Sequence, residues 1–114
     1  MAGGPTTPEL VAAVGKAGGF GFLASGSIDA AELGRQMRAV AEFAPVPYGV
    51  NLFSPQQERI SEAALARAVE FARPAFARAG LELPEVPAPD YGFGWEEKLA
   101  AIERAAQLGY GPSW

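Results

Sequence analysis

The sequence of 114 residues lacks both cysteine and histidine. Without cysteine it has no disulfide, thiolate nucleophile or cysteine-ligated metal. Without histidine it has no imidazole general base and no histidine-ligated metal. Its acidic residues are scattered and do not suggest the paired carboxylates of general acid–base catalysis. The sequence therefore predicts neither a catalytic residue nor a metal site within the 114 residues.

An excess of positive charge and long apolar runs are also absent. The formal net charge is −4, which gives no electrostatic attraction for nucleic acid or an anionic membrane. No apolar run approaches the ~20 residues that span a bilayer. The N-terminus lacks the basic region and apolar stretch of a signal peptide. We therefore expect a cytoplasmic protein with neither a nucleic-acid nor a membrane partner.

What the sequence does contain is an alternation of helical and extended patterns. Hydrophobic residues make up 49% of the chain and charged residues 19%, which predicts a packed domain. The pattern predicts a helix over residues 8–17, a strand over 20–24, a helix from about residue 30, and a strand over 48–53. A strand, a helix and a strand in this order imply a right-handed crossover, so we expect the two strands to be parallel neighbours.

The rest of the chain predicts two further helices and a loop. A long helix covers residues 61–79, and Pro74 should kink or split it. Residues 82–93 are rich in proline and predict a loop. A last helix begins at Gly94 or Trp95. Helical spacing places these residues on the packed faces of the four helices in turn: Leu10, Val14 and Ala17; Leu33, Met37, Val40 and Ala44; Leu65, Val69 and Phe76; Leu99, Ile102 and Ala106.

Helix starts and stops are marked by capping residues. Thr7 can cap the first helix with Pro8 at its first position, or Thr6 can form a capping box with Glu9. The second helix starts with Asp29 and Glu32 in a D-x-x-E pattern. Glycine pairs and single glycines mark the ends of the first and third helices, at residues 18–19 and at residue 80.

The most informative segment is the N-terminus, where a glycine pair leads directly into a helix. Gly3 and Gly4 allow positive φ and close approach of another group to the backbone. The following helix directs unpaired N–H groups at this turn, which favours anions and polar ligand atoms. In α/β proteins such a turn normally follows a strand on the ligand side of the sheet. The sequence reads as if a strand preceded residue 1.

Residues 1–26 read MAGGPTTPELVAAVGKAGGFGFLASG, and residues 48–53 read YGVNLF. Together they resemble the N-terminal part of the nitronate monooxygenase family, formerly called 2-nitropropane dioxygenase. The resemblance continues more loosely through the LELP segment at residues 81–84 and the GWEEKL segment at residues 94–99. It extends to about residue 106.

The resemblance implies an α/β fold with parallel strands and outer helices, namely the first βα units of a TIM barrel without its first strand. Family members bind FMN noncovalently and oxidise alkyl nitronates with O2. Met1, Ala2 and Gly3 match the segment that approaches the isoalloxazine ring, and Asn51 matches a residue whose amide reaches the flavin. Ser25 and Gly26 are expected near the same face, although loop punctuation also explains them.

The resemblance also implies that parts of the family site are absent. The catalytic histidine and the phosphate-binding loops of the family lie in later segments. We therefore expect residues 1–106 to be the N-terminal portion of such a barrel and residues 107–114 to be an irregular tail. FMN binding should be weak or absent, and the chain should be inactive alone.

Three functions stay open at this point. The first is an N-terminal fragment of an FMN-dependent nitronate monooxygenase-like oxidoreductase, whose complete form acts on a small-molecule nitronate. The second is a noncatalytic α/β module that binds a partner through exposed sheet edges. The third is one half of a split flavin-binding barrel. Unpaired strand edges also predict self-association or pairing with a complementing half of the barrel.

Overall fold

The computed structural model describes residues 4–86 and 88–113, which divide into two compact units. The larger unit combines the first 55 residues with residues 92–114, and the smaller unit covers residues 56–91. The elements follow in the order α1 (Pro8–Lys16), β1 (Gly21–Ala24), α2 (Ala30–Phe43), β2 (Tyr48–Asn51), α3 (Glu62–Arg78) and α4 (Trp95–Gln107). Helix α3 belongs to the smaller unit and all the other elements to the larger one.

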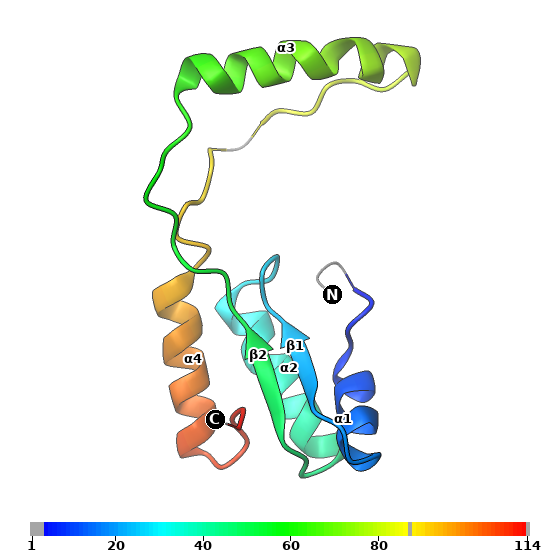
Figure 1. The fold of residues 1–114 in the computed structure, drawn as a ribbon, viewed down its shortest axis with the longest axis vertical. Coiled ribbons are helices and arrows are strands. Elements are labelled where there is room, and N and C mark those ends of the chain that lie inside the picture. Colours follow the sequence, from blue (N-terminus) through cyan, green and yellow to red (C-terminus); the bar gives the residue numbers. More distant parts are fainter. Residues whose placement is uncertain (1–3, 87, 114) are drawn as a thin grey trace. The chain divides into compact units, whose positions relative to one another are not determined.

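The two strands form a parallel pair, as the sequence predicts. Gly21 lies opposite Tyr48 and Ala24 lies opposite Asn51, so the four-residue strands are in register. Both strands are shorter than expected, since Phe20 precedes β1 and residues 52–53 follow β2 outside the ladder. Helices α1, α2 and α4 lie on one side of this small sheet (Figure 1). The arrangement is that of consecutive βα units.

The structure decides between the two expected caps of helix α1. Thr7 is the N-cap, and its hydroxyl accepts a hydrogen bond of 3.3 Å from the backbone N–H of Leu10. The helix ends at Gly18, whose φ of +84° allows the backbone to reverse. The N–H groups of Gly18 and Gly19 then bond to the carbonyls of Gly15 and Val14, at 3.0 and 2.9 Å.

Helix α2 packs against the core through a face that the sequence analysis predicted in full. Asp29 caps it, accepting a 2.7 Å hydrogen bond from the backbone N–H of Glu32. The predicted residues Leu33, Met37, Val40 and Ala44 are all buried. The central cluster of the larger unit is completed by residues of both strands and of α1 and α4: Val11, Leu23, Tyr48, Ile102 and Ala105.

The predicted packed faces of α1 and α4 are rotated from those observed. Leu10 is 50% exposed, whereas Val11 and Ala12 are buried. The reason is the close approach of α1 to β1, where a Cβ on Gly21 would lie 3.0 Å from the Val11 Cα. In α4 the buried residues are Lys98, Ile102 and Ala105 rather than Leu99 and Ala106. The spacing of apolar residues alone did not identify which face of α1 or α4 is buried.

The segment after α4 folds back onto the core. The Tyr48 hydroxyl donates a 2.7 Å hydrogen bond to the carbonyl oxygen of Tyr110. The backbone N–H of Ser113 donates to the carbonyl of Tyr48 at 2.8 Å, on the side of β2 away from β1. Pro112 is buried. Tyr48 therefore ties this segment to the first residue of β2.

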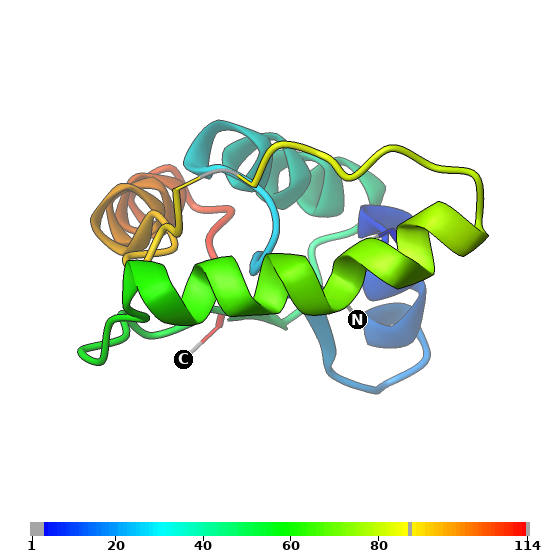
Figure 2. The same ribbon diagram turned by 90° about the horizontal axis from the view of Figure 1, so that it is seen from above.

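The smaller unit consists of helix α3 and the segments on either side of it. Ser61 caps the helix with a 3.2 Å bond from the N–H of Ala64. Of the two effects expected of Pro74, a kink or a split, the structure excludes the split, since α3 runs continuously through it (Figure 2). Proline removes one hydrogen bond, which a helix of 17 residues tolerates. Gly80, with a φ of +67°, ends the helix as predicted.

Helix α3 has no buried face within its own unit. None of its residues, all of which the structure describes, is buried, and Phe71 is 89% exposed. The predicted face of Leu65, Val69 and Phe76 is only partly covered. Tyr91 connects the ends of the unit, because its backbone carbonyl and its hydroxyl accept bonds from the N–H groups of Gln56 and Ile60.

The buried Tyr48 hydroxyl leads to a prediction for alkaline pH. Burial raises the pKa of Tyr48 from 10.0 to about 12. The neutral phenol is thus favoured in the folded state, and its stabilising effect is present below pH 10 and decreases as pH rises towards 12. Tyr48→Phe should lower the unfolding free energy by about 1 kcal/mol at pH 7, and the difference should shrink above pH 10. Urea denaturation of both proteins measures this. A pH-independent difference would contradict it.

Candidate functional site

The candidate site lies at the carboxyl ends of the two parallel strands. Ala24 and Asn51 are the paired last residues of β1 and β2, and residues 25–27 form the turn that follows β1. The arrowheads of both strands point to this edge of the larger unit in Figure 1. In parallel α/β folds ligands bind at the carboxyl ends of the strands. The fold thus brings Asn51 and Ser25 together at the expected edge.

Ser25 links the two strand ends through hydrogen bonds to Asn51. Its backbone N–H and its side-chain Oγ both donate to the carbonyl oxygen of Asn51, at 3.2 and 2.7 Å. The Ser25 side chain is completely buried by these contacts. The alternative that Ser25 serves only as a loop residue is therefore incomplete, because its hydroxyl extends the pairing of the strands by one residue.

Lys98 is a site residue that the sequence analysis missed. It is only 3% exposed, and its Nζ donates a 2.8 Å hydrogen bond to the carbonyl oxygen of Ser25. A buried lysine needs such a partner, because an unpaired buried charge is very costly. The available signal was its spacing: Lys98 precedes Ile102 and Ala105 by four and seven residues, so it lies on the buried face of α4.

Two phenylalanines lie next to the turn that follows β1. A Cβ on Gly26 would come within 2.5 Å of the Phe53 ring, so only glycine fits there without a shift. Phe53 and Phe93 form an edge-to-face pair with centroids 5.6 Å apart. Phe93 has a φ of +52° and is, among the described residues, the one non-glycine residue with positive φ. The aromatic pair and the glycine together fix the path of the chain between the strand ends and α4.

The side chain of Asn51 is exposed. Side chains alternate along a strand, and Leu23 and Tyr48 point into the core, so Asn51 shares the opposite, open face of the sheet with Phe22 and Gly49. A primary amide provides both a donor and an acceptor for the edge of a heteroaromatic ring. The Asn51 amide is thus available on the open face of the sheet, whereas the Lys98 ammonium group is committed to the carbonyl of Ser25.

The three other predicted flavin contacts, Met1, Ala2 and Gly3, lie outside the described residues. The next residue, Gly4, has a φ of +109°, and a Cβ there would meet nothing within 4 Å. The chain at Gly4 thus adopts a conformation that glycine favours, as the N-terminal turn requires. Whether these three residues reach the same edge as Asn51 stays a prediction.

The open face of the sheet carries an apolar groove. Its volume is about 340 Å³. Phe20 and Phe22 lie there, 46% and 56% exposed, with ring centroids 5.2 Å apart. Residues of both strands, of α4 and of the last segment line the groove: Phe20, Phe22, Gly49, Val50, Leu52, Leu99, Ile102, Pro112 and Ser113. Apolar side chains left exposed in this way indicate a surface that another element covers.

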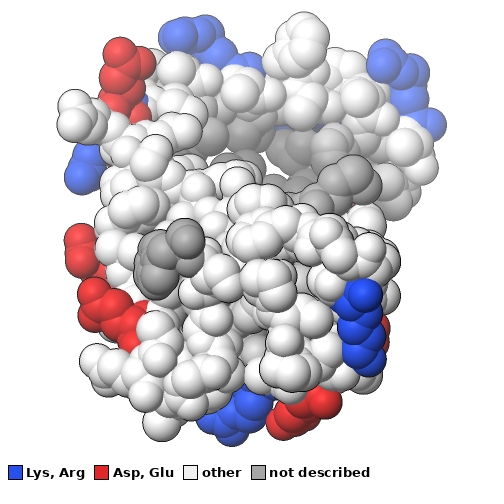
Figure 3. All heavy atoms as spheres, turned by 60° about the horizontal axis from the view of Figure 1, so that its bottom comes forward, with Lys and Arg blue, Asp and Glu red and all other residues white. Residues whose placement is uncertain are grey.

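The charged side chains are spread over the surface of the described residues. On the face seen in Figure 3 the charged side chains of both signs lie mostly around the margins. Across the part of the chain that the structure describes, no group of three or more acidic, cysteine or histidine residues is placed to hold a metal ion. No helix among the described residues has the length and apolar character needed to cross a membrane.

The comparisons with known proteins agree with one another. Residues 1–103 match the model of the family described as nitronate monooxygenase. The chain is 42% identical over 55 residues to a probable nitronate monooxygenase of Staphylococcus saprophyticus and 40% identical over 55 residues to one of Bacillus subtilis. Each match covers 48% of this chain and 16% of the relative.

A solved structure extends the similarity to most of the chain. The nitroalkane oxidase from Streptomyces ansochromogenes matches with a TM-score of 0.78 and 34% sequence identity, covering 90% of this chain and 28% of that protein. The fold is therefore α/β with parallel strands and outer helices, the architecture of part of a TIM barrel. The chain spans about a sixth of the length of the curated relatives and over a quarter of the solved neighbour.

The contact between Lys98 and Ser25 leads to a prediction about stability. Lys98→Met retains the aliphatic part of the side chain but leaves the buried carbonyl of Ser25 without its donor. We expect the unfolding free energy to fall by about 1–3 kcal/mol. Chemical denaturation provides the measurement, with Lys16→Met as the matched control, because Lys16 is exposed at the end of α1. Equal losses in both variants would show that the bond to Ser25 contributes nothing.

Proposed function

The chain belongs to the nitronate monooxygenase family, and on this basis we propose that it supplies one wall of an FMN site in an enzyme that oxidises alkyl nitronates with O2. The observation that carries this proposal is the position of Asn51. It ends a parallel strand with its side chain on the open face, at the edge where barrel enzymes of this architecture bind their ligands.

Four residues are proposed to contact the flavin. Asn51 would hold the ring edge through its side-chain amide, and Met1, Ala2 and Gly3 would approach the ring through backbone groups. FMN, when bound, supplies the redox chemistry of the oxidation. The contributions of the chain itself are to orient the ring edge and to keep the strand ends in register through Ser25 and Lys98.

We further propose that the 114 residues do not catalyse the reaction alone. The sequence contains no histidine, the residue type that the resemblance assigns to the family's base. Lys98, which reaches the turn after β1, is occupied by the Ser25 carbonyl, so it would offer the FMN phosphate no charge-assisted bond. A flavin held only by its ring edge should therefore bind weakly or not at all.

We propose the cytoplasm as the location.

The apolar groove supports one addition to this proposal. Phe20 and Phe22 are exposed along a groove that residues of α4 and of the last segment also line, and a sheet edge with such neighbours favours pairing with another strand. We propose that this face is covered by self-association or by a complementing half of the barrel. The split-barrel function is the second candidate, and the groove is the observation that favours it.

The first prediction of the proposed function concerns flavin content. The purified chain should lack stoichiometric FMN and should not consume O2 with an alkyl nitronate, because it has neither the histidine base nor the FMN phosphate-binding loops that the resemblance assigns to the family. Visible absorbance of the purified chain and an oxygen electrode measure these two properties. A yellow protein with one FMN per chain would overturn the proposed inactivity, and turnover would do so even at low flavin content.

The second prediction concerns Asn51. A chimera in which residues 1–103 replace the matching segment of the Streptomyces nitroalkane oxidase should retain FMN. In that chimera Asn51→Ala should weaken flavin affinity by about five- to a hundredfold, since a lost hydrogen bond to a buried partner costs ~1–3 kcal/mol. Gln57→Ala, an exposed amide in the smaller unit, is the control. Unchanged affinity in Asn51→Ala would remove Asn51 from the site.

The third prediction concerns association. Phe22→Ser should weaken self-association of the chain by about tenfold or more, because burying a phenylalanine contributes ~1.5–3 kcal/mol. Sedimentation velocity across a concentration series provides the measurement. Phe71→Ser is the matched control, since Phe71 is also exposed but lies on α3. If the control has the same effect, the groove is not the contact surface.

A further inference from the structure

A second pocket lies in the larger unit on the side of the helices. It is formed between helices α2 and α4 and has a volume of about 290 Å³, at the lower end of the range for small-molecule sites. It is lined by α2, α4 and Tyr110, so it is distinct from the apolar groove that Phe20 and Phe22 line. Nothing in the proposed flavin site uses it.

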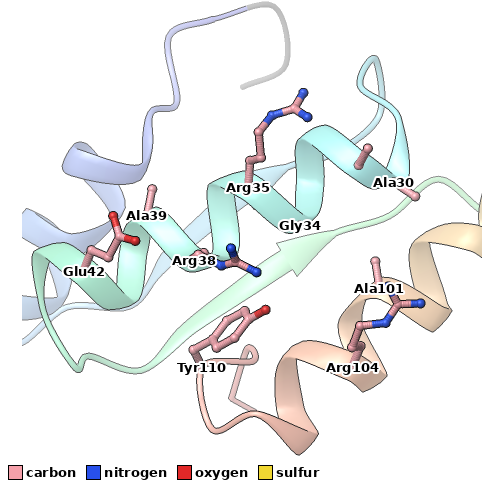
Figure 4. A pocket seen from close by; sticks show the side chains of 10 residues that line it. Ala30, Gly34, Arg35, Arg38, Ala39, Glu42, Ala101, Arg104 and Tyr110 are labelled. Atoms are coloured by element: carbon pink, nitrogen blue, oxygen red, sulfur yellow. The ribbon is translucent and has the colours of Figure 1, made fainter.

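Two arginines and a tyrosine converge on this pocket. Arg38 comes from α2, Arg104 from the last turn of α4, and Tyr110 from the segment that folds back (Figure 4). In that view the Tyr110 hydroxyl and the guanidinium groups of Arg38 and Arg104 lie in the space between α2 and α4. Guanidinium groups bind planar or tetrahedral oxyanions through paired N–H donors.

Arg38 contacts the Tyr110 side chain and also interacts with the negative charge of Glu42, and both raise the pKa of Arg38 above its usual value. Its guanidinium carbon lies 5.8 Å from the centroid of the Tyr110 ring. Tyr110 is held in turn at both backbone groups, since its N–H donates to Ala105 at 3.0 Å and its carbonyl accepts from the Tyr48 hydroxyl at 2.7 Å. Tyr110 is thus anchored through both backbone groups, and its ring lies beside Arg38 at the pocket.

The charges around the pocket do not cancel. Arg35 also lines it but is paired with Glu32 at 2.6 Å. Glu42 lies toward the far end of α2 from Arg35 and faces the same pocket (Figure 4). Among the described residues no ion pair engages either Arg38 or Arg104. The lining therefore retains an excess of positive charge on a protein whose net charge is −4.

Gly34 is the second, independent observation. It lies inside α2, where glycine costs about 1 kcal/mol relative to alanine. Packing does not require it, because a Cβ there would meet nothing within 4 Å, and Gly34 is not among the residues with positive φ. What the missing side chain does provide is depth, since Gly34 forms part of the pocket lining.

We propose that this pocket binds a small oxyanion, a phosphate or a carboxylate group, between Arg38 and Arg104. Gly34 leaves room for the ligand, and the two guanidinium groups supply its charge-assisted hydrogen bonds. The ligand is small, because about 290 Å³ accommodates a single anionic group with a few attached atoms rather than a nucleotide cofactor. The site lies outside the strand ends and does not depend on the flavin assignment.

The test is isothermal titration calorimetry of the purified chain with inorganic phosphate and, separately, with citrate at low ionic strength. We expect saturable binding of one anion per chain in the millimolar range, weakened by added NaCl. The more tightly bound of the two identifies the anionic group. Arg38→Gln and Arg104→Gln should each weaken binding about tenfold or more.

Three further variants make the result specific. Gly34→Leu fills the pocket without changing any charge and should abolish binding, and leucine favours the helix more than glycine does. Glu42→Gln removes a repulsive carboxylate and should strengthen binding a few-fold. Arg67→Gln in the smaller unit removes the same charge as the two test variants and should have no effect. Far-ultraviolet circular dichroism confirms that each variant is folded.

Two outcomes would overturn the pocket as a whole, and a further one would overturn the pair of arginines. One is the absence of saturable binding of either anion. The other is binding that Gly34→Leu leaves intact or that Arg67→Gln weakens as much as Arg38→Gln, because the anion would then respond to overall charge and not to this pocket. A folded Arg104→Gln variant with unchanged affinity would remove Arg104 from the site and leave no pair of guanidinium groups.

Discussion

The larger unit depends on how two four-residue parallel strands satisfy their backbone groups, because a two-stranded sheet is marginal by itself. Ser25 extends the ladder by donating twice to the Asn51 carbonyl. Lys98 then covers the Ser25 carbonyl from α4. At the opposite end Tyr48 joins β2 to the last segment through its hydroxyl and its carbonyl. Both strand ends are thereby anchored to α4 or to the segment that follows it.

These anchors give the two sides of the sheet different chemistry. The helix side is packed, since Leu33, Met37 and Val40 fill it completely. The open side presents Phe22, Gly49 and Asn51, a combination of apolar surface and one amide. The proposed flavin site uses this open side, since a flavin ring is itself largely apolar and is oriented by few polar contacts. The arginines of the larger unit lie instead on the helices.

Several elements could be read from the sequence because their signals are local. The cap at Asp29, the stop at Gly80 and the apolar periodicity of α2 each depend on residues within a few positions of one another. The parallel pairing of the strands followed from the handedness of the crossover. Asn51 was identified through the resemblance as a flavin contact, which stays a prediction; the structure shows that it is the last residue of β2.

The sequence by itself thus determined the order of elements, the cap of α2 at Asp29, the parallel pair and the family. Only the tertiary structure decided which faces of α1 and α4 are buried, that Lys98 is a core residue, and that Tyr110 folds back under Arg38. The physical reason is the separation along the sequence over which each interaction acts. Helix caps and periodicity act within one or two turns, whereas the environment of Lys98 is set by Ser25, 73 residues away in the chain. No local pattern contains that partner.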